Sequence, residues 1–283
     1  MDVIGIIPAR YGSSRFEGKV LAEIQGKPMV QWVWEQAKKA KILDELIVAC
    51  DDKRIEEAVN GFGGKAVLTS KEHLSGTDRI CEVVNPLEVK VIVNIQADEP
   101  LLDAVMIENV ARPLLDDSRL NMATMMKRID DPHEISDPNV VKVTIDRHGF
   151  ALYFSRAAIP YQRDKPPRRR RGNSQSHKPE GNGGQPNSRS HKPEGNGAAS
   201  ASRSHKSVKA AYYKHIGLYA YSKDFLFIFK NLPESNLERI EKLEQLRVLE
   251  EGFRIKVIET NIPTLGVDTP EDLEKVKKML SRR

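Results

Sequence analysis

The chain has 283 residues, a formal net charge of +5 and 39% hydrophobic residues. This length suits one large α/β domain or two small ones. No apolar run approaches the roughly 18 residues of a membrane span, and no basic segment precedes a long apolar one at the N-terminus. The two cysteines, Cys50 and Cys81, are too few for a disulfide framework or a zinc site. These features argue against a membrane or secreted protein and predict a soluble, cytoplasmic one.

The positive charge is concentrated in one segment. Residues 165–209 hold 11 Lys and Arg against two Glu, a balance of +9, whereas the rest of the chain holds 34 basic and 38 acidic residues. A 14-residue repeat starts at Ser176 and Ser190, and a third copy begins at Ser204. The segment has no Leu, Ile, Phe, Trp, Tyr or Met, so it cannot bury enough apolar surface to offset the entropy of ordering. It is predicted to be a disordered basic insert, and its arginine run (168–171) is interpreted as solvated charge rather than a nucleic-acid site.

The first predicted strand, residues 3–7, leads directly into a loop suited to phosphate. The loop follows Pro8 and contains Gly12, Ser13, Ser14 and Gly18 together with Arg10, Arg15 and Lys19. Small residues let a backbone approach a ligand closely, and fixed cations beside free amides suit a polyphosphate. The spacing is not that of a P-loop, because Val20 stands where that motif needs a hydroxyl after its lysine. From these residues alone, a basic surface turn is an equal alternative.

The following segments alternate between strand and helix patterns. Strands are predicted at 45–50, 65–68 and 89–95, and helices at 28–37, 53–60, 77–84 and 105–115. Further along, a strand pair is predicted at 139–145 and 150–154, strands at 213–221 and 253–259, one capped helix from Ser235 to about 250, and a C-terminal helix from Pro270. This order predicts an α/β fold with a doubly wound, mostly parallel sheet and a smaller antiparallel part.

Carboxylates follow or precede predicted elements at two informative places. Ligands of doubly wound sheets bind beyond the carboxyl ends of the strands, and Asp98 and Glu99 follow the strand at 89–95. A carboxylate there, facing a triphosphate loop, is a natural Mg²⁺ ligand. Asp268 stands before the C-terminal helix, where a helix-entry role and a second metal role are both open.

Ordered motifs along nearly the whole chain resemble those of the 3-deoxy-manno-octulosonate (Kdo) cytidylyltransferase family. They are IIPARYGSSR followed by GK, GKPM, HLSGTDR, NIQADEP, NVVKV, GFALYFSRAAIPY, KHIGLYAY, EKLEQLRVLEEG and GVDTPEDL. The related acylneuraminate cytidylyltransferases share the first loop but not the FSRAxIP, HIGLYAY and LEQLRVL set. The resemblance implies a nucleotide-diphospho-sugar transferase fold, transfer of CMP from CTP to the acid sugar Kdo for lipopolysaccharide biosynthesis, and a homodimer.

The resemblance also implies a role for each matching residue. Lys19, Asp98 and Asp268 would be catalytic, and the last two would hold Mg²⁺. The nucleotide would be bound by Pro8, Ala9, Arg10, Arg15, Lys19, Ser75, Gly76 and Gln96, and the sugar by Arg156, His215, Glu241 and Gln245. From the residues alone, pairing within the sheet remains open for Arg156, as does a satisfied, half-buried role for His215.

One cytidylyltransferase domain is predicted over 1–283. Its parts are a nucleotide-binding part (1–125), a sugar-binding and dimerisation part (126–262), the insert (165–209), and a metal-binding loop and helix (263–283). The chain departs from the family at Ala97, where a Gly is usual, at Phe16-Glu17, where Leu-Pro is usual, and in the insert. CTP and Kdo are the predicted partners, with neither membrane nor nucleic acid. The alternatives are a modified sugar such as 8-amino-Kdo, and a nucleic-acid-binding protein that uses the insert.

Overall fold

The computed structural model describes residues 1–12, 16–73, 75–163 and 210–281. The chain divides into two units, Met1–Pro160 with Ala211–Arg283, and Tyr161–Ala210. Every element named below belongs to the first unit. The predicted insert lies outside the described residues.

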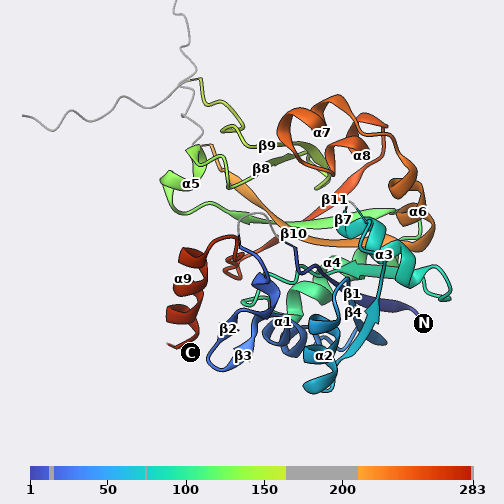
Figure 1. The fold of residues 1–283 in the computed structure, drawn as a ribbon. Helices are drawn as coiled ribbons and strands as arrows, with labels where there is room; N and C mark the ends of the chain where they lie inside the picture. The colour runs from blue at the N-terminus through green and yellow to red at the C-terminus, as the bar shows by residue number, and fades with distance from the viewer. Residues whose placement is uncertain (13–15, 74, 164–209, 282–283) are drawn as a thin grey trace, which may run out of the picture. The chain divides into compact units, whose positions relative to one another are not determined.

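A nine-stranded sheet forms the centre of the first unit (Figure 1). Its strands are β1 (Val3–Ala9), β4 (Glu45–Cys50), β5 (Lys65–Leu68), β6 (Val91–Asn94), β7 (Met122–Arg128), β8 (Lys142–Ile145), β9 (Ala151–Ser155), β10 (Tyr213–Ser222) and β11 (Ile255–Thr260). A separate hairpin consists of β2 (Glu23–Ile24) and β3 (Lys27–Pro28). The helices are α1 (Met29–Ala37), α2 (Lys53–Gly61), α3 (Gly76–Val84), α4 (Ala104–Asp116), α5 (Pro132–Ser136), α6 (Lys223–Asn231), α7 (Asn236–Glu241), α8 (Leu246–Glu250) and α9 (Pro270–Leu280), with a 3₁₀ turn at Lys19–Leu21.

The main sheet has the order β11-β7-β10-β6-β1-β4-β5, and β8 and β9 extend it from β10. Strand β1 runs parallel to β4 and β6, β4 runs parallel to β5, and β11 runs parallel to β7. Strand β10 is antiparallel to both β6 and β7, which places a reversed strand in the middle of the sheet. The prediction of a doubly wound, mostly parallel sheet with an antiparallel part is confirmed.

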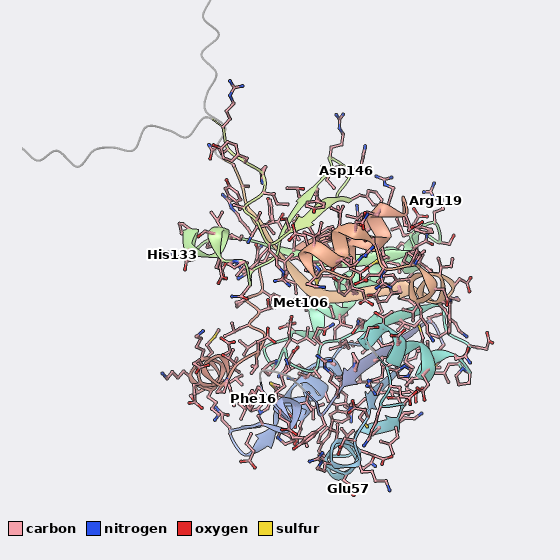
Figure 2. The ribbon with its side chains drawn as sticks, turned by 45° about the horizontal axis from the view of Figure 1, so that its top comes forward. Phe16, Glu57, Met106, Arg119, His133 and Asp146 are labelled. Atoms are coloured by element: carbon pink, nitrogen blue, oxygen red, sulfur yellow. The ribbon has the colours of Figure 1, made fainter. Side chains whose placement is uncertain are left out.

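Both faces of β1 are buried, which explains its unbroken apolar sequence. Val3 and Ile7 belong to a core cluster that includes residues of α1 and α4, whereas Ile4 and Ile6 belong to a second cluster with α3 and α6. Met106 of α4 is fully buried and lies inside the side-chain mass in Figure 2, while Glu57, Arg119 and His133 point outward. Among the described residues no helix is long and apolar enough to cross a membrane.

The prediction of one helix from Ser235 to about 250 is wrong. Ser235 does cap α7 through its side chain, as predicted, but Lys242 adopts a left-handed conformation (φ 54°, ψ 49°) and ends the helix. The Arg156 guanidinium donates to the Glu241 carbonyl at 2.7 Å, in place of the donor that the next helical turn would supply. The apolar periodicity of 237–249 continues through this break, so the pattern could not reveal it.

Candidate active site

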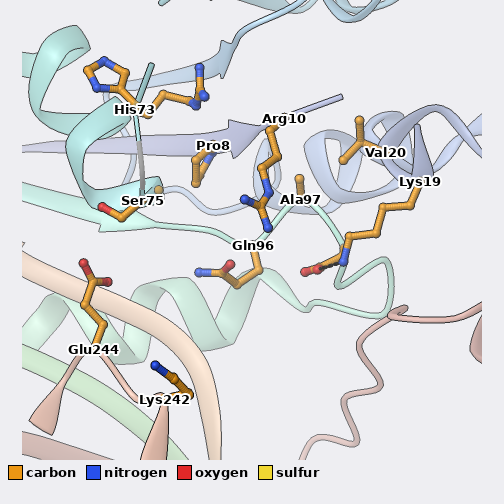
Figure 3. A pocket seen from close by; sticks show the side chains of 13 residues that line it. Pro8, Arg10, Lys19, Val20, His73, Ser75, Gln96, Ala97, Lys242 and Glu244 are labelled. Carbon is orange, nitrogen blue, oxygen red and sulfur yellow. Dashed lines mark hydrogen bonds and ion pairs between the residues drawn. The ribbon is translucent and has the colours of Figure 1, made fainter. Parts of the chain in front are cut away.

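A cavity of about 620 Å³ lies at the carboxyl edge of the parallel strands (Figure 3). The ends of β1, β4 and β6 meet there because the three strands are parallel neighbours. The cavity is lined by Pro8, Arg10, Lys19, Val20, His73, Ser75, Gly76, Arg79, Gln96, Ala97, Asp98, Lys242 and Glu244. Figure 3 shows Lys242 and Glu244 across the cavity from His73 and Arg10. Of the predicted nucleotide residues that the structure describes, all but Ala9 line this cavity, and Ala9 is buried in the sheet.

The loop after β1 is closed by a backbone hydrogen bond. The Gly18 amide donates to the Tyr11 carbonyl at 2.9 Å, and Gly18 has φ +66°. A Cβ at Gly18 would lie 3.1 Å from the Tyr11 ring, so both the backbone angle and the close approach require glycine. This closure fixes Lys19 at the start of the 3₁₀ turn. Arg15, the remaining predicted cation of the loop, lies outside the described residues.

Lys19 joins the two predicted metal carboxylates. Its ammonium lies 2.5 Å from Asp98 Oδ2 and 3.2 Å from Asp268 Oδ1, and it also donates to the Val267 carbonyl at 3.1 Å. The Val267 amide in turn donates to the Asp98 carbonyl at 2.9 Å. Because residues 98 and 268 come from distant parts of the sequence, their meeting depends on how the C-terminal segment docks.

The docking of α9 explains this meeting. Val267, Leu273 and Val276 form a buried cluster with Ile24 and Met29 of the N-terminal part. Thr269 caps α9 by accepting a hydrogen bond from the amide of residue 272, so the helix starts at Pro270 as predicted. The apolar face of α9 therefore holds the loop containing Asp268 against Lys19.

The N-terminus of α3 forms another wall of the cavity. Ser75 and Asp78 make a capping box, in which each side chain accepts from the other residue's backbone amide. Gly76 packs beside Pro8, and a Cβ at position 76 would lie 3.5 Å from Cγ of the proline ring. Opposite them, Gln96 donates to the Asn94 side chain at 3.3 Å. A helix N-terminus with backbone donors favours an anionic or acceptor-rich ligand here.

Arg156 and Glu241 contact each other and do not line this cavity. They do not line the smaller neighbouring cavity described below either. Besides the Glu241 carbonyl, the Arg156 guanidinium donates to the Pro138 carbonyl at 2.9 Å. The Glu241 carboxylate accepts from the Ser155 hydroxyl at 2.6 Å and from the Arg156 amide at 2.9 Å. In this arrangement the two predicted sugar residues connect β9 to the turn between α7 and α8.

Gln245 lines the smaller cavity, of about 140 Å³. The two cavities share Pro8, Gly76, Gln96 and Glu244 as walls. The Gln245 side chain is 5% exposed, and its Nε2 has no hydrogen-bond partner among the described residues. Burial raises the pKa of the neighbouring Glu244 carboxyl, which accepts from Thr77 at 3.1 Å. An acceptor on a ligand would satisfy the buried amide of Gln245.

His215 is a half-buried imidazole on β10. Its Nε2 lies 3.0 Å from Thr124 Oγ1, and its ring meets Phe154 edge-on at 5.0 Å. Burial lowers the pKa of His215 to about 3, far below its usual 6.5. The imidazole therefore faces other residues of the sheet as an uncharged group.

This shift predicts how stability depends on pH. Between pH 6.5 and pH 3 the unfolded chain protonates His215 and the folded chain does not, so acid favours unfolding. From pH 7.5 to pH 5, the free energy of unfolding should fall by about 2 kcal/mol more in the unaltered protein than in His215→Gln. Urea unfolding at both pH values measures this, with the exposed His148→Gln as the control. Equal losses in all three proteins would contradict the prediction.

Six lining residues were not assigned a role from the sequence, and four of them carry ionisable side chains: His73, Arg79, Lys242 and Glu244. His73 and Arg79 flank the predicted Ser75-Gly76 pair within HLSGTDR, so the motif already pointed to them. Lys242 and Glu244 precede and follow the buried Leu243, and both line the cavity. In an unbroken helix, residues two apart would point in different directions. The left-handed residue at 242 is what presents them to the cavity.

The chain is similar to known cytidylyltransferases along its length. A cytidylyltransferase family model matches residues 4–258. The chain is 48% identical over 282 residues to a 3-deoxy-manno-octulosonate cytidylyltransferase of Geotalea uraniireducens (strain Rf4), covering 100% of both chains. It is 44% identical over 280 residues to the protein of the same name from Geobacter sulfurreducens, covering 99% of this chain and 100% of that one.

A solved CMP:2-keto-3-deoxy-manno-octonic acid synthetase in complex with CTP has a TM-score of 0.80 and 38% identity, covering 100% of this chain and 99% of that one. A 4-diphosphocytidyl-2C-methyl-D-erythritol synthase from Anaerococcus prevotii, at 12% identity and a TM-score of 0.56, shares the fold alone. The match to the family model and the similarity to relatives over their full length establish that this chain belongs to the 3-deoxy-manno-octulosonate cytidylyltransferase family.

Proposed function

We propose that this enzyme transfers CMP from CTP to Kdo, giving CMP-Kdo and pyrophosphate. The observation that carries the proposal is the meeting of Arg10, Lys19 and Asp98 in the wall of one cavity, with Asp268 bound to Lys19. Cations there match a triphosphate, and two carboxylates beside them match a phosphate-bound Mg²⁺. Neither an amino-sugar substrate nor a nucleic-acid function has an observation of its own to favour it.

The reaction is an in-line substitution at the α-phosphorus. The anomeric hydroxyl oxygen of Kdo forms a bond to the α-phosphorus, the bond to the β-phosphate bridging oxygen breaks, and the hydroxyl proton passes to solvent. Positioning and neutralisation of charge account for most catalysis in such transfers. Arg10 and Lys19 would bind the phosphates, and the amides at the start of α3 and Gln96 would hold the nucleoside.

The Lys19 cluster is compatible with Mg²⁺. Two carboxylates already converge on one positive group, and Mg²⁺ prefers oxygen ligands shared with substrate phosphates and water. Asp98 and Asp268 would hold the ion. No group of three or more His, Cys, Asp or Glu in the described residues could hold a metal, so phosphates and water would complete its shell. When bound, Mg²⁺ would neutralise phosphate charge and make the sugar hydroxyl more acidic.

The sugar is proposed to occupy the smaller cavity and its surroundings. The buried amide of Gln245 and the carboxyl of Glu244 suit the hydroxyls of a sugar acid. Lys242, in the wall of the larger cavity, would provide a positive charge for the carboxylate of the sugar acid. Arg156, Glu241 and His215 remain proposed sugar residues. In the arrangement seen here, Arg156 and Glu241 would act by holding the turn after α7 in place, and His215 by its packing on β10. A homodimer, a cytoplasmic location and a role in lipopolysaccharide biosynthesis belong to the same proposal, supported by the family resemblance.

Pyrophosphate release tests the substrates. Each nucleoside triphosphate is paired with Kdo, 8-amino-Kdo and N-acetylneuraminate, and released pyrophosphate is measured in the presence of Mg²⁺. We expect release with CTP and Kdo. Release with 8-amino-Kdo alone, or no release with any pair, would contradict the proposal.

A further inference from the structure

Asp51 follows β4 at the edge where the cavity lies, but it does not line the cavity. The register pairs Cys50 with Ala9, so the residues that follow these strands lie side by side. Asp51 Oδ1 accepts a hydrogen bond from the Tyr11 amide at 2.9 Å. Asp51 therefore binds the backbone directly after Arg10. This is the beginning of the loop from residue 10 to residue 19, which we call the phosphate loop.

The other oxygen of Asp51 binds a different wall. Oδ2 lies 3.1 Å from Arg79 Nη2, and the two side chains are only 14% and 4% exposed. Arg79 is on α3, and its Nη1 donates to the Thr69 hydroxyl and to the Ser70 carbonyl, the latter at 3.3 Å. A guanidinium buried to this degree needs an anionic partner, because its unpaired burial is strongly unfavourable. One carboxylate thus joins the phosphate loop to the helix that flanks the nucleotide.

The Tyr11 peptide is held on both sides. Its amide is bound by Asp51, and its carbonyl accepts from Gly18, which precedes Lys19. The Arg54 guanidinium also stacks on the Tyr11 ring, 3.4 Å from the centroid. The position of Tyr11 therefore determines where Arg10 and Lys19 stand relative to Arg79.

We propose that Asp51 is a positioning residue for CTP. It sets the phosphate loop and Arg79 at the spacing that the nucleotide requires, without touching the nucleotide. The inference rests on the proposed CTP chemistry. The inference predicts that CTP binding is weakened and Kdo binding is not. The loop cations and Arg79 line the larger cavity, which we assign to CTP, whereas Gln245 lines only the smaller cavity, which we assign to the sugar.

The test variant is Asp51→Asn. An asparagine oxygen can still accept from Tyr11, but its amide group would face the Arg79 guanidinium donor to donor. We expect the Kd for CTP, from titration calorimetry, and the KM for CTP to rise about ten-fold, the loss of one charge-assisted contact. The KM for Kdo should stay within two-fold. Asp117→Asn, which removes the carboxylate from an exposed pair with Arg119, is the matched control and should change neither constant.

A purely structural role gives a different result. If Asp51 only stabilised the fold, the variant would lose active protein, and kcat would fall with both KM values and the CTP Kd unchanged; that outcome overturns the inference. If Asp51→Asn does not fold, Asp51→Glu keeps the charge for Arg79 and displaces the Tyr11 contact. It should still weaken CTP binding about five-fold, and unaltered CTP affinity in it would equally overturn the inference.

A double-mutant cycle locates the effect. Combined with Arg10→Ala, Asp51→Asn should weaken CTP binding by less than the product of the single effects, because both act through the same loop. Effects that multiply would refute a role through the loop. Binding of CTP by the unaltered protein, read in the same titrations, is the separate test of the proposed function.

Discussion

Asp98→Asn should abolish CMP transfer and leave the fold unchanged. The carboxylate lies at the cavity wall, 2.5 Å from the Lys19 ammonium, and is the first proposed ligand of Mg²⁺. An amide keeps the shape but loses the charge that a metal ligand needs. Removing one electrostatic group that acts in the transition state costs about 100-fold to 1,000-fold in kcat, and we expect at least this loss. Pyrophosphate release measures it, and circular dichroism verifies the fold.

Metal binding provides a second readout for Asp98. In calorimetric titrations with Mg²⁺ in the presence of CTP, the enthalpy change assigned to the ion should be lost in Asp98→Asn. Asp103→Asn, five residues further on, is the control, because Asp103 only caps α4 through the amide of Val105. A variant at position 98 with substantial turnover and the same Mg²⁺ dependence would rule out the metal role.

Arg10→Ala and Lys19→Ala should each weaken CTP binding far more than Kdo binding. Each variant removes a cation from the cavity wall that we assign to phosphate. The loss of one charge-assisted contact costs about 1.5–3 kcal/mol, or roughly ten-fold to over a hundred-fold in affinity. Lys19→Ala also leaves the Asp98 and Asp268 carboxylates without the cation between them, so its effect should be the larger.

The matched controls are Arg119→Ala and Lys275→Ala, which remove exposed, ion-paired cations that do not line the cavity. Direct titration with CTP gives its Kd, and steady-state kinetics give the KM for each substrate. Similar losses for CTP and Kdo in the Arg10 variant would indicate general misfolding and contradict the assignment of this residue to phosphate.

Local sequence was sufficient for several elements. The unbroken apolar strand at the N-terminus, the helix predicted at 77–84 and the Thr269-Pro270 start of α9 all depend on neighbouring residues, and each is present in the structure. Strand β7 was not predicted, because its Met-rich sequence lacks the β-branched pattern of a strand. Helix α6, rich in Phe, was not predicted either; its buried residues Phe225, Leu226 and Phe229 pack in the core cluster that contains Ile4 and Ile6.

The chemistry of the site was only partly determined by local sequence. The phosphate loop, Gln96 and Asp98 follow strand ends, and the rule that parallel strands end at one edge was enough to bring them together. Asp268 and Lys19 meet because the apolar face of α9 docks on Ile24 and Met29, which no local pattern specifies.

The amino-acid sequence by itself therefore predicted the family, most of the strand-helix order and the residues that we propose to face phosphate. Only the tertiary structure decided that α7 ends at Lys242, that Arg156 binds the carbonyls of that turn, and that Asp51 connects the phosphate loop to Arg79. The physical reason is the same in each case. A helix break, a buried guanidinium and a shared carboxylate are fixed by hydrogen bonds between segments far apart in the chain, and periodicity records only the neighbours along it.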